Sequence, residues 1–459
     1  MYSISKRILV TLWIMSCILF LQPTANAYNE TDSNFLVITD IHLNKTTSHR
    51  MDIAPTERDR ANDLDNTTFD TLLTMVQSSI QNGTIPTPKF ILLLGDVAQH
   101  DPESTSNTAD DAQAVFQKVK QAFPSIPLLY IFGNNDSLDI HYGPFYADTP
   151  VGVWHSVYDV AKDSGWNDGF LSTGISCQNT TKTYPCLITE DAKLGHYSAY
   201  LQKNLRLIGI NSIVFSKDRQ HLTETDAQTE LNWVTEQLQT AQQKQESVLL
   251  ATHIPLGLKM EDNNLQWTAD DHAKFLQLIS SYKNNIIGVL VAHTHMEELK
   301  VIRTDQQHNI IVMLNSPSLC TYSANAPAVK TYYYRQNNTT WELTDTSTFY
   351  ISQTSNGLLL QKLFDYNAYY CVKSSQHITD CLSRITLSKM NTYYTAGNNN
   401  YRPTLLYPDA LYIDLPASAG QGDSSNNFAT IAAVAAVAVG ATVLTASQMA
   451  KKKGKNIKN

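Results

Sequence analysis

Short apolar runs alternate with amphipathic stretches through the first three hundred residues. The apolar runs are bounded by polar or turn residues, which is typical of buried strands. These predicted strands cover residues 35–39, 90–94, 128–132, 205–210, 247–251 and 286–292. The stretches between them place apolar residues at helical spacing. These predicted helices cover residues 65–80, 109–123, 225–242 and 269–282. The alternation predicts an α/β fold with helices on both faces of a sheet.

Polar side chains follow five of the predicted strands, just past the end of each. They are Asp40, His42, Asp96, Asn134, His253, His293 and His295. Open α/β sheets bind ligands at the carboxyl ends of their strands, so we expect these side chains to meet. One Asp or His at a strand end is more often a cap or turn residue, and Gly95 and Gly133 would then be ordinary turn glycines. The ordered set instead favours a site for borderline divalent ions such as zinc, manganese or iron.

The pattern changes after about residue 300. β-like segments follow, and the stretch from Gly357 to Met390 then predicts helix. We therefore predict a main domain over residues 28–354 and a small helical C-terminal subdomain over residues 355–417. A linker rich in Gly, Ser and Asn covers residues 418–427.

The N-terminal end has the parts of a secretory signal peptide. Within residues 1–27, Lys6 and Arg7 precede an apolar run, and the small residues Ala25 and Ala27 predict cleavage before residue 28. An uncleaved membrane anchor is the alternative. We therefore expect an exported protein whose main domain lies outside the cytoplasm.

The C-terminal end predicts a membrane helix. Residues 428–450 contain no charged side chain and are long enough to cross a bilayer. The basic tail at residues 451–459 predicts that the C-terminus stays on the cytoplasmic side. A removable lipid-anchor signal is the competing interpretation, but such signals normally end in the apolar stretch. The mature chain would be either secreted or anchored to a membrane by this helix.

The body of the chain is acidic. Both predicted terminal segments carry basic residues only, so residues 28–427 contain 27 Lys and Arg against 42 Asp and Glu, a net charge of −15. A body with this net charge repels long polyanions. We therefore expect no nucleic-acid partner, and the sequence does not indicate an oligomeric state.

Five cysteines remain after the predicted cleavage. Cys177 with Cys186 and Cys371 with Cys381 predict two short-range disulfides in an oxidising compartment. A zinc knuckle is disfavoured because neither pair has CxxC spacing. Cys320 is predicted to be a buried free thiol. N-x-S/T sequons typical of a secreted surface occur at Asn29, Asn66, Asn82, Asn179 and Asn338.

Short motifs occur in a fixed order along the chain. They are Asp-x-His at 40–42, Gly-Asp at 95–96, Gly-Asn-Asn-Asp at 133–136, Thr-His-Ile-Pro at 252–255 and Ala-His-Thr-His at 292–295. The ordered set resembles the calcineurin-like metallophosphoesterases over roughly residues 34–351. The sequences His-Ile-Pro-Leu-Gly at 253–257 and His-Thr-His-Met-Glu-Glu at 293–298 are closest to the acid-sphingomyelinase-like branch.

The resemblance implies a four-layer α/β/β/α sandwich with two divalent metal ions, zinc in the first place and manganese or iron as alternatives. The implied ligands are Asp40, His42 and His295 for one ion, Asn134, His253 and His293 for the other, and Asp96 as the bridge. In this chemistry a hydroxide shared by the ions attacks phosphorus. The implied function is hydrolysis of a phosphodiester, in a sphingomyelin-like lipid or a nucleotide.

Two positions near the predicted centre bear on the chemistry. Asn135 stands where most of the family has a histidine that can protonate the leaving group or hold the phosphate, and general-acid catalysis contributes about 10²–10⁴-fold. His100 matches a second histidine of the acid-sphingomyelinase-like branch and is the candidate acid, with a structural cap as the alternative. Asn135 also fits an endopolyphosphatase, whose phosphate leaving group needs less help. A non-catalytic metal-binding surface receptor or adhesin is the remaining alternative.

Overall fold

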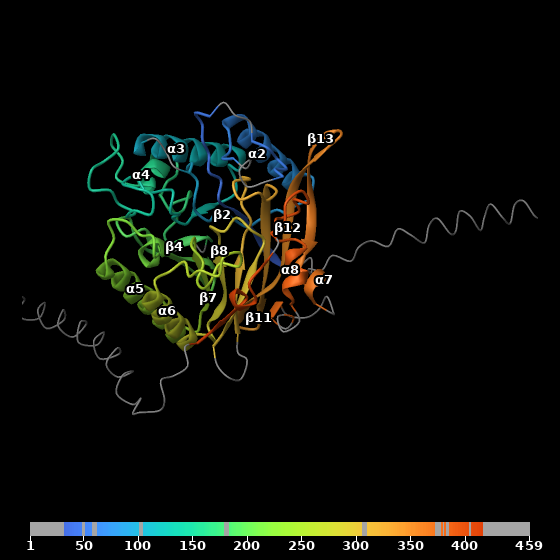
Figure 1. Ribbon diagram of the computed structural model, residues 1–459. Coiled ribbons are helices and arrows are strands. Elements are labelled where there is room, and N and C mark those ends of the chain that lie inside the picture. Colours follow the sequence, from blue (N-terminus) through green and yellow to red (C-terminus); the bar gives the residue numbers. More distant parts are fainter. Residues whose placement is uncertain are drawn as a thin grey trace, which may run out of the picture. The chain divides into compact units, whose positions relative to one another are not determined.

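The structure, a computed structural model, describes residues 32–415 with short gaps (Figure 1). The gaps fall at residues 48–50, 57–61, 101–103, 179–182, 305–309, 372–377, 380, 382–384 and 404. The predicted signal peptide, linker, membrane helix and basic tail all lie outside the described residues. Within those residues, no helix is both long and apolar enough to cross a membrane.

In the described part of the chain, one sheet contains six strands in the order β13-β12-β11-β1-β2-β3. Its parallel half consists of β1 (Ser33–Ile38), β2 (Ile91–Leu93) and β3 (Leu128–Tyr130). Its antiparallel half consists of β11 (Ala328–Asn337), β12 (Thr340–Thr354) and β13 (Gly357–Asp365). Every residue of β2 and β3 is buried, as is typical of parallel strands that are covered on both faces.

The other sheet has the order β14-β9-β10-β8-β7-β6-β5-β4 over the described residues. Its central parallel strands are β6 (Leu205–Ile210), β7 (Ser247–Thr252), β8 (Ile286–Val291) and β10 (Ile310–Asn315). Its outer strands are β4 (Cys186–Asp191), β5 (His196–Gln202), β9 (Leu299–Arg303) and β14 (Tyr412–Asp414). β6 and β7 are also buried throughout.

The inner faces of the two sheets pack against each other. A Cβ added to Gly288 of β8 would lie 2.8 Å from Leu343 of β12. A Cβ added to Gly209 of β6 would lie 2.7 Å from Ile131, which follows β3. These glycines therefore permit a close approach between the sheets.

The larger helices fall into two groups. The first group is α2 (Asn66–Gln81), α3 (Thr105–Ala122) and α4 (Val157–Asp163). The second group is α5 (Glu224–Gln243) and α6 (Ala269–Ser281). α2 contacts α3 and β13, whereas α5 contacts β6, β7 and α6, and Figure 1 shows the groups apart from each other. The structure is thus a mixed α/β fold with two sheets, which confirms the α/β prediction.

Side-chain caps explain where two of these helices begin. The carboxylate of Asp65 accepts hydrogen bonds from the backbone N–H groups of Thr67 and Thr68 at the start of α2. Thr223 and Asp226 form a capping box at the start of α5. Caps of this kind satisfy donors that have no partner inside the helix.

The C-terminal region differs from the prediction of a helical subdomain. Residues 357–365 form strand β13, and β14 pairs with β9. The only α-helical elements described after β13 are the short α7 (Tyr366–Tyr370) and α8 (Leu387–Asn391). The prediction of helix from Gly357 onwards is therefore wrong for β13. Asn356 and Gly357 lie at a tight hairpin turn between β12 and β13, and Asn-Gly is a strong hairpin signal.

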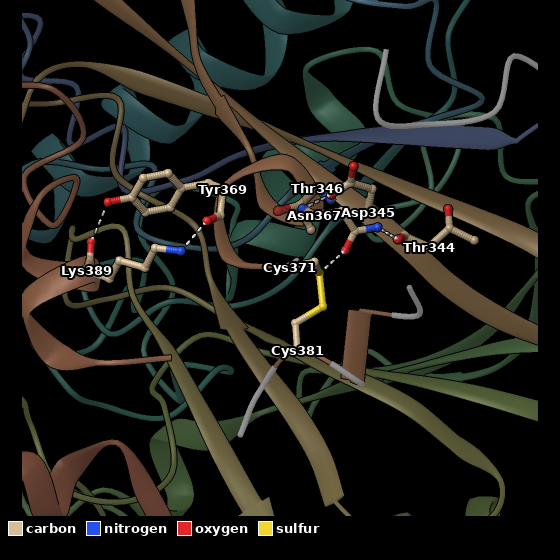
Figure 2. Close-up of a disulfide and its surroundings, with 8 residues drawn as sticks. All are labelled: Thr344, Asp345, Thr346, Asn367, Tyr369, Cys371, Cys381 and Lys389. Atoms are coloured by element: carbon tan, nitrogen blue, oxygen red, sulfur yellow. Dashed lines mark hydrogen bonds between the residues drawn. A yellow bond between two sulfur atoms is a disulfide. The ribbon is translucent and has the colours of Figure 1, made fainter. Parts of the chain in front are cut away.

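Both predicted cysteine pairs form disulfides, Cys177–Cys186 and Cys371–Cys381, and Cys320 is a buried free cysteine. Figure 2 shows that the second disulfide lies beside Asn367, which contacts the start of the buried part of β12.

Asn367 N donates to Asp345 Oδ1 at 2.9 Å, and Thr346 N donates to the same oxygen at 2.8 Å. Burial raises the pKa of Asp345 to about 7.

Candidate metal centre

The six-stranded sheet presents four of the seven predicted ligands. Asp40 and His42 follow β1, Asp96 follows β2 and Asn134 follows β3. Since these strands are parallel neighbours, their carboxyl ends meet at one edge. Asp40, His42 and Asp96 each offer a ligand atom, and these atoms lie within 4.8 Å of one another.

The eight-stranded sheet presents the other three. His253 follows β7, and His293 and His295 follow β8, its parallel neighbour. Ligand atoms of Asp96, His253 and His293 also lie within 4.8 Å of one another. The distance from His295 Nε2 to Asp40 Oδ1 is 3.5 Å. The two sheets therefore deliver their polar side chains to one place.

Asp96 lies between the two groups of side chains. Its Oδ2 is 3.5 Å from His42 Nε2 and 3.2 Å from His253 Nε2. Asp40 Oδ1 is likewise 3.9 Å from His42 Nε2 and 3.8 Å from His253 Nε2. One carboxylate thus belongs to both ligand groups, which is the arrangement that a shared ligand requires.

The backbone at these positions is strained. Five of the seven residues have positive φ angles, a region that non-glycine residues seldom adopt. They are Asp40 (46°), His42 (46°), Asp96 (52°), His293 (69°) and His295 (66°). Such conformations cost on the order of 1–3 kcal/mol each and concentrate at functional sites. The fold therefore keeps these side chains in place at an energetic cost.

Several buried polar atoms of the centre have no hydrogen-bond partner among the described residues. They are Asp40 Oδ1, His42 Nε2, Asn134 Oδ1 and His253 Nε2. Buried polar atoms are normally paired, because leaving one unpaired costs about 1–3 kcal/mol. All four atoms are of types that bind divalent metal ions. This donor set fits metal ions at the centre.

The outer ring nitrogens of two histidines are bonded to the backbone. His42 Nδ1 lies 3.1 Å from Ala98 O, and His253 Nδ1 lies 2.7 Å from Leu94 O. In a neutral ring, a nitrogen that donates to a carbonyl leaves the other nitrogen unprotonated and turned inwards, as in most histidine metal ligands. These contacts orient Nε2 of both rings towards Asp96.

Burial and the neighbouring charged side chains together set the pKa values at the centre. Burial lowers the pKa of His42, His293 and His295 well below the usual range, so these rings stay neutral, the form that binds metals. Burial also disfavours charged His253, but the carboxylates of Asp96 and Asp40 outweigh this effect and raise its pKa to about 9. Burial alone would raise the pKa of Asp96, yet His253 and His42 hold it well below the usual range.

Asp136 organises the ligand loops, a role that sequence reasoning missed. Its Oδ2 accepts hydrogen bonds from Asp96 N at 2.9 Å, Gly133 N at 3.0 Å and the Tyr130 hydroxyl at 2.7 Å. Its Oδ1 accepts from Val97 N at 2.8 Å. A Cβ on Gly133 would lie 2.2 Å from Asp96 N, so only glycine fits there. The Gly-Asn-Asn-Asp motif contained this residue but not its contacts.

A family model for calcineurin-like phosphoesterases matches residues 33–297, more than half of the chain. The chain belongs to this family.

Curated relatives of the chain have names that are more specific than the family description. Sphingomyelin phosphodiesterase B of Dictyostelium discoideum is 24% identical over 338 residues, which cover 70% of this chain and 49% of that protein. Sphingomyelinase phosphodiesterase C of the same organism is 25% identical, covering 65% and 66%. Cyclic GMP-AMP phosphodiesterase SMPDL3A of Mus musculus is 23% identical, covering 59% and 58%. The chain thus spans only about half to two thirds of these proteins. They confirm the resemblance to the sphingomyelinase-like branch.

Asn135 departs from the family pattern, and the structure shows what it contacts. Its Nδ2 donates to Asp96 Oδ2 at 2.7 Å, and its backbone N donates to Asp96 Oδ1 at 2.8 Å. A side-chain amide does not titrate, so Asn135 is no proton donor for a leaving group. In this calcineurin-like phosphoesterase, Asn135 instead holds the carboxylate shared by the two ligand groups.

His100 lies against the centre, within a stack of aromatic rings. Its ring is 3.5 Å from that of His42 and 3.7 Å from that of Tyr322, both nearly parallel to it. His100 Nδ1 lies 2.6 Å from Asp63 Oδ1, which orients the ring. Ligand-type atoms of His42, His100 and His295 lie within 4.8 Å of one another. The structure therefore brings His100 to the predicted site.

Two further side chains touch the ligands and were not predicted. Asn134 Nδ2 donates to His141 Nε2 at 3.0 Å, which leaves Asn134 Oδ1 as the atom that faces no partner. The Tyr142 hydroxyl is 3.4 Å from His293 Nε2. No motif or spacing marks His141 or Tyr142, because their contacts arise only when the loop after β3 folds back over the site.

Proposed function

We propose that the chain is a two-metal phosphodiesterase. The observation that carries the proposal is Asp96, which is shared between a group with Asp40 and His42 and a group with His253 and His293. A simple binding site for one cation would not need two overlapping groups. The family membership and the unpaired buried atoms support the same conclusion.

The proposal gives each side of the centre a role. In this proposal the ligands are Asp40, His42 and His295 for one ion, Asn134, His253 and His293 for the other, and Asp96 for both. Bound divalent ions would supply an activated water and neutralise charge on the phosphoryl oxygens. Asn135 keeps Asp96 in place by its two hydrogen bonds.

His100 is the proposed proton donor to the leaving group. Its ring lies beside His42 and is held by Asp63 through Nδ1, so Nε2 is the atom available to a substrate. Its side chain is 17% exposed, which leaves access from solvent. A donor in this place would compensate for Asn135, whose amide does not act as an acid.

The substrate is proposed to be a phosphodiester of the kind that the relatives' names describe, a sphingomyelin-like lipid or a nucleotide. The net charge of −15 over residues 28–427 disfavours long polyphosphate chains. The helix groups on either side of the sheets support the four-layer sandwich implied by the family. The two disulfides support an exported protein, and labelling of Cys177 by a thiol reagent in the natural protein would contradict that.

A chromogenic phosphodiester tests the activity directly. The purified chain with added zinc or manganese should hydrolyse bis(p-nitrophenyl) phosphate, and Asp96→Asn should lower the rate by about 10³-fold or more, because metal assistance contributes several kcal/mol. Asp70→Asn, on the surface of α2, is the matched control. Equal rates for the wild type and Asp96→Asn would overturn the enzyme proposal in favour of a receptor or adhesin.

A substrate panel then separates the remaining alternatives. Sphingomyelin, cyclic and linear nucleotides, and polyphosphate should be compared for released product with the same metal. Preference for the first two classes supports the phosphodiesterase proposal. Preference for polyphosphate would replace it with an endopolyphosphatase.

A further inference from the structure

Two neighbouring loops contain no proposed metal ligand, and one of them forms part of the His100 side of the centre through Tyr322. The first loop is residues 51–56, and the second loop is residues 320–326. The two are in contact, since Thr321 Oγ1 of the second loop donates to Asp52 O of the first at 3.0 Å. Their relative placement therefore shapes this side of the site.

The second loop is attached to the metal ligands themselves. Cys320 N donates to Asp40 O at 3.2 Å, and Cys320 Sγ lies 3.8 Å from His295 Nδ1. Tyr322, two residues later, stacks on His100 and is 42% exposed. A shift of the second loop would therefore move an aromatic ring that faces both the proposed donor and the solvent.

Asn398 joins the two loops through one buried side chain. Its Nδ2 donates to Pro55 O of the first loop at 2.9 Å and to Ala324 O of the second at 2.8 Å. Its Oδ1 accepts from Asn400 N at 3.0 Å. A side-chain amide has two N–H groups, so each donor is used on a different loop. Asn398 is only 3% exposed.

Neighbouring residues strengthen the same connection. Asn400 Nδ2 donates to Ala54 O of the first loop at 3.1 Å. Ala326 N of the second loop donates to Thr395 O at 3.0 Å, and Thr395 Oγ1 donates to Asn398 O at 2.8 Å. The C-terminal segment 395–400 thus bonds to both loops, although it lies about one hundred residues beyond the family match at 33–297.

We propose that Asn398 is a positioning residue for substrate recognition. By holding the two loops together, it fixes Tyr322 against His100 and so forms the wall that meets the leaving-group side of the substrate. The proposal rests on the proposed function. The side chain of Asn398 hydrogen-bonds to Pro55, Ala324 and Asn400, none of which is a proposed ligand, so it should affect binding of a large substrate more than turnover of a small one.

Asn398→Asp tests this, because it keeps the shape of the side chain and turns a carboxylate towards two carbonyl oxygens. KM for sphingomyelin in mixed micelles should rise at least about fivefold, while kcat for bis(p-nitrophenyl) phosphate should change less than about twofold. Amide hydrogen exchange should become faster in both loops. Asn232→Asp, on the exposed face of α5, adds the same charge elsewhere. It should leave KM and the hydrogen exchange of both loops unchanged.

Asn400→Ala provides a milder variant if Asn398→Asp fails to fold. It removes one exposed hydrogen bond and should give a smaller change in the same direction. Unchanged amide hydrogen exchange in both variants, or equal changes in the kinetic constants for the two substrates, would overturn the proposal. If exchange rises in both loops while the wild type cleaves no phosphodiester, the proposed function is overturned and the positioning of the loops is supported.

Discussion

The two sheets make unequal contributions to the centre. The six-stranded sheet provides both carboxylates, the amide of Asn134 and one imidazole, whereas the eight-stranded sheet provides only imidazoles. Burial lowers the pKa of His293 and His295 on the eight-stranded side, whereas the two carboxylates of the acidic side raise the pKa of His253 to about 9. The difference teaches that the two overlapping ligand groups need both sheets, because both carboxylates come from one half of the fold and most of the nitrogen donors come from the other.

Removing one imidazole from each half is expected to have the largest effect. His42→Ala takes a ring from the six-stranded sheet and His253→Ala takes one from the eight-stranded sheet. Each should lower phosphodiester turnover by about 10³-fold or more, since a metal ion contributes several kcal/mol to such chemistry. Metal content per chain, measured by mass spectrometry, should fall in both variants.

His155→Ala, whose ring stacks on Tyr146 away from the ligands, is the control. If only one of the two ligand variants lost activity and metal, a single sheet would be sufficient and the comparison would fail.

His100→Ala should have the next largest effect and should depend on the substrate. General acid catalysis contributes about 10²–10⁴-fold where the leaving group needs a proton. Turnover of an alkyl phosphodiester should therefore fall at least about a hundredfold, while an activated nitrophenyl ester should lose much less. Similar losses for both substrates would show that His100 packs against His42 without donating a proton.

Asp345 shows what happens to a buried carboxyl group of the six-stranded sheet that has no imidazole facing it. Its pKa is raised to about 7 by burial, whereas histidines hold the pKa of Asp96 far below the usual range. The folded protein therefore binds the proton of Asp345 more tightly than the unfolded chain does. The stability that this group contributes is greatest at low pH and is lost as pH rises through about 7.

Asp345→Asn should consequently raise the melting temperature by a few degrees at pH 8, with a gain that shrinks as the pH falls towards 4. Asn keeps an oxygen acceptor for the N–H groups of Thr346 and Asn367. Thermal unfolding across this pH range provides the measurement. A difference from wild type that stayed constant with pH would contradict the raised pKa.

Local pattern was sufficient to predict which polar side chains lie together at the centre, but not the residues that support them. Asp40, Asp96 and His253 each follow a buried apolar strand, and this is visible within a few residues of sequence. Asp136 and Asn398 act through backbone groups of distant segments, which no local window contains. The ligand roles themselves stay predictions until a metal-bound form is measured.

The error at β13 has a similar origin. Leu358, Leu359 and Leu360 form a short apolar run, which fits a helix and a strand equally well. Pairing with residues 347–354 of β12, which is a tertiary contact, makes this segment a strand. In the strand Leu360 is buried and Leu359 is 47% exposed, which is the alternation expected for one covered face.

The positive φ angles of five proposed ligands link the stability of the fold to its proposed metal binding. Glycine would adopt these conformations without penalty, so replacing His293 or His295 by glycine removes strain as well as a nitrogen donor. Such a variant should resist heat better in the presence of a chelator while losing its capacity for metal. At these positions the variant with the highest thermal stability and the variant with the highest metal affinity are different.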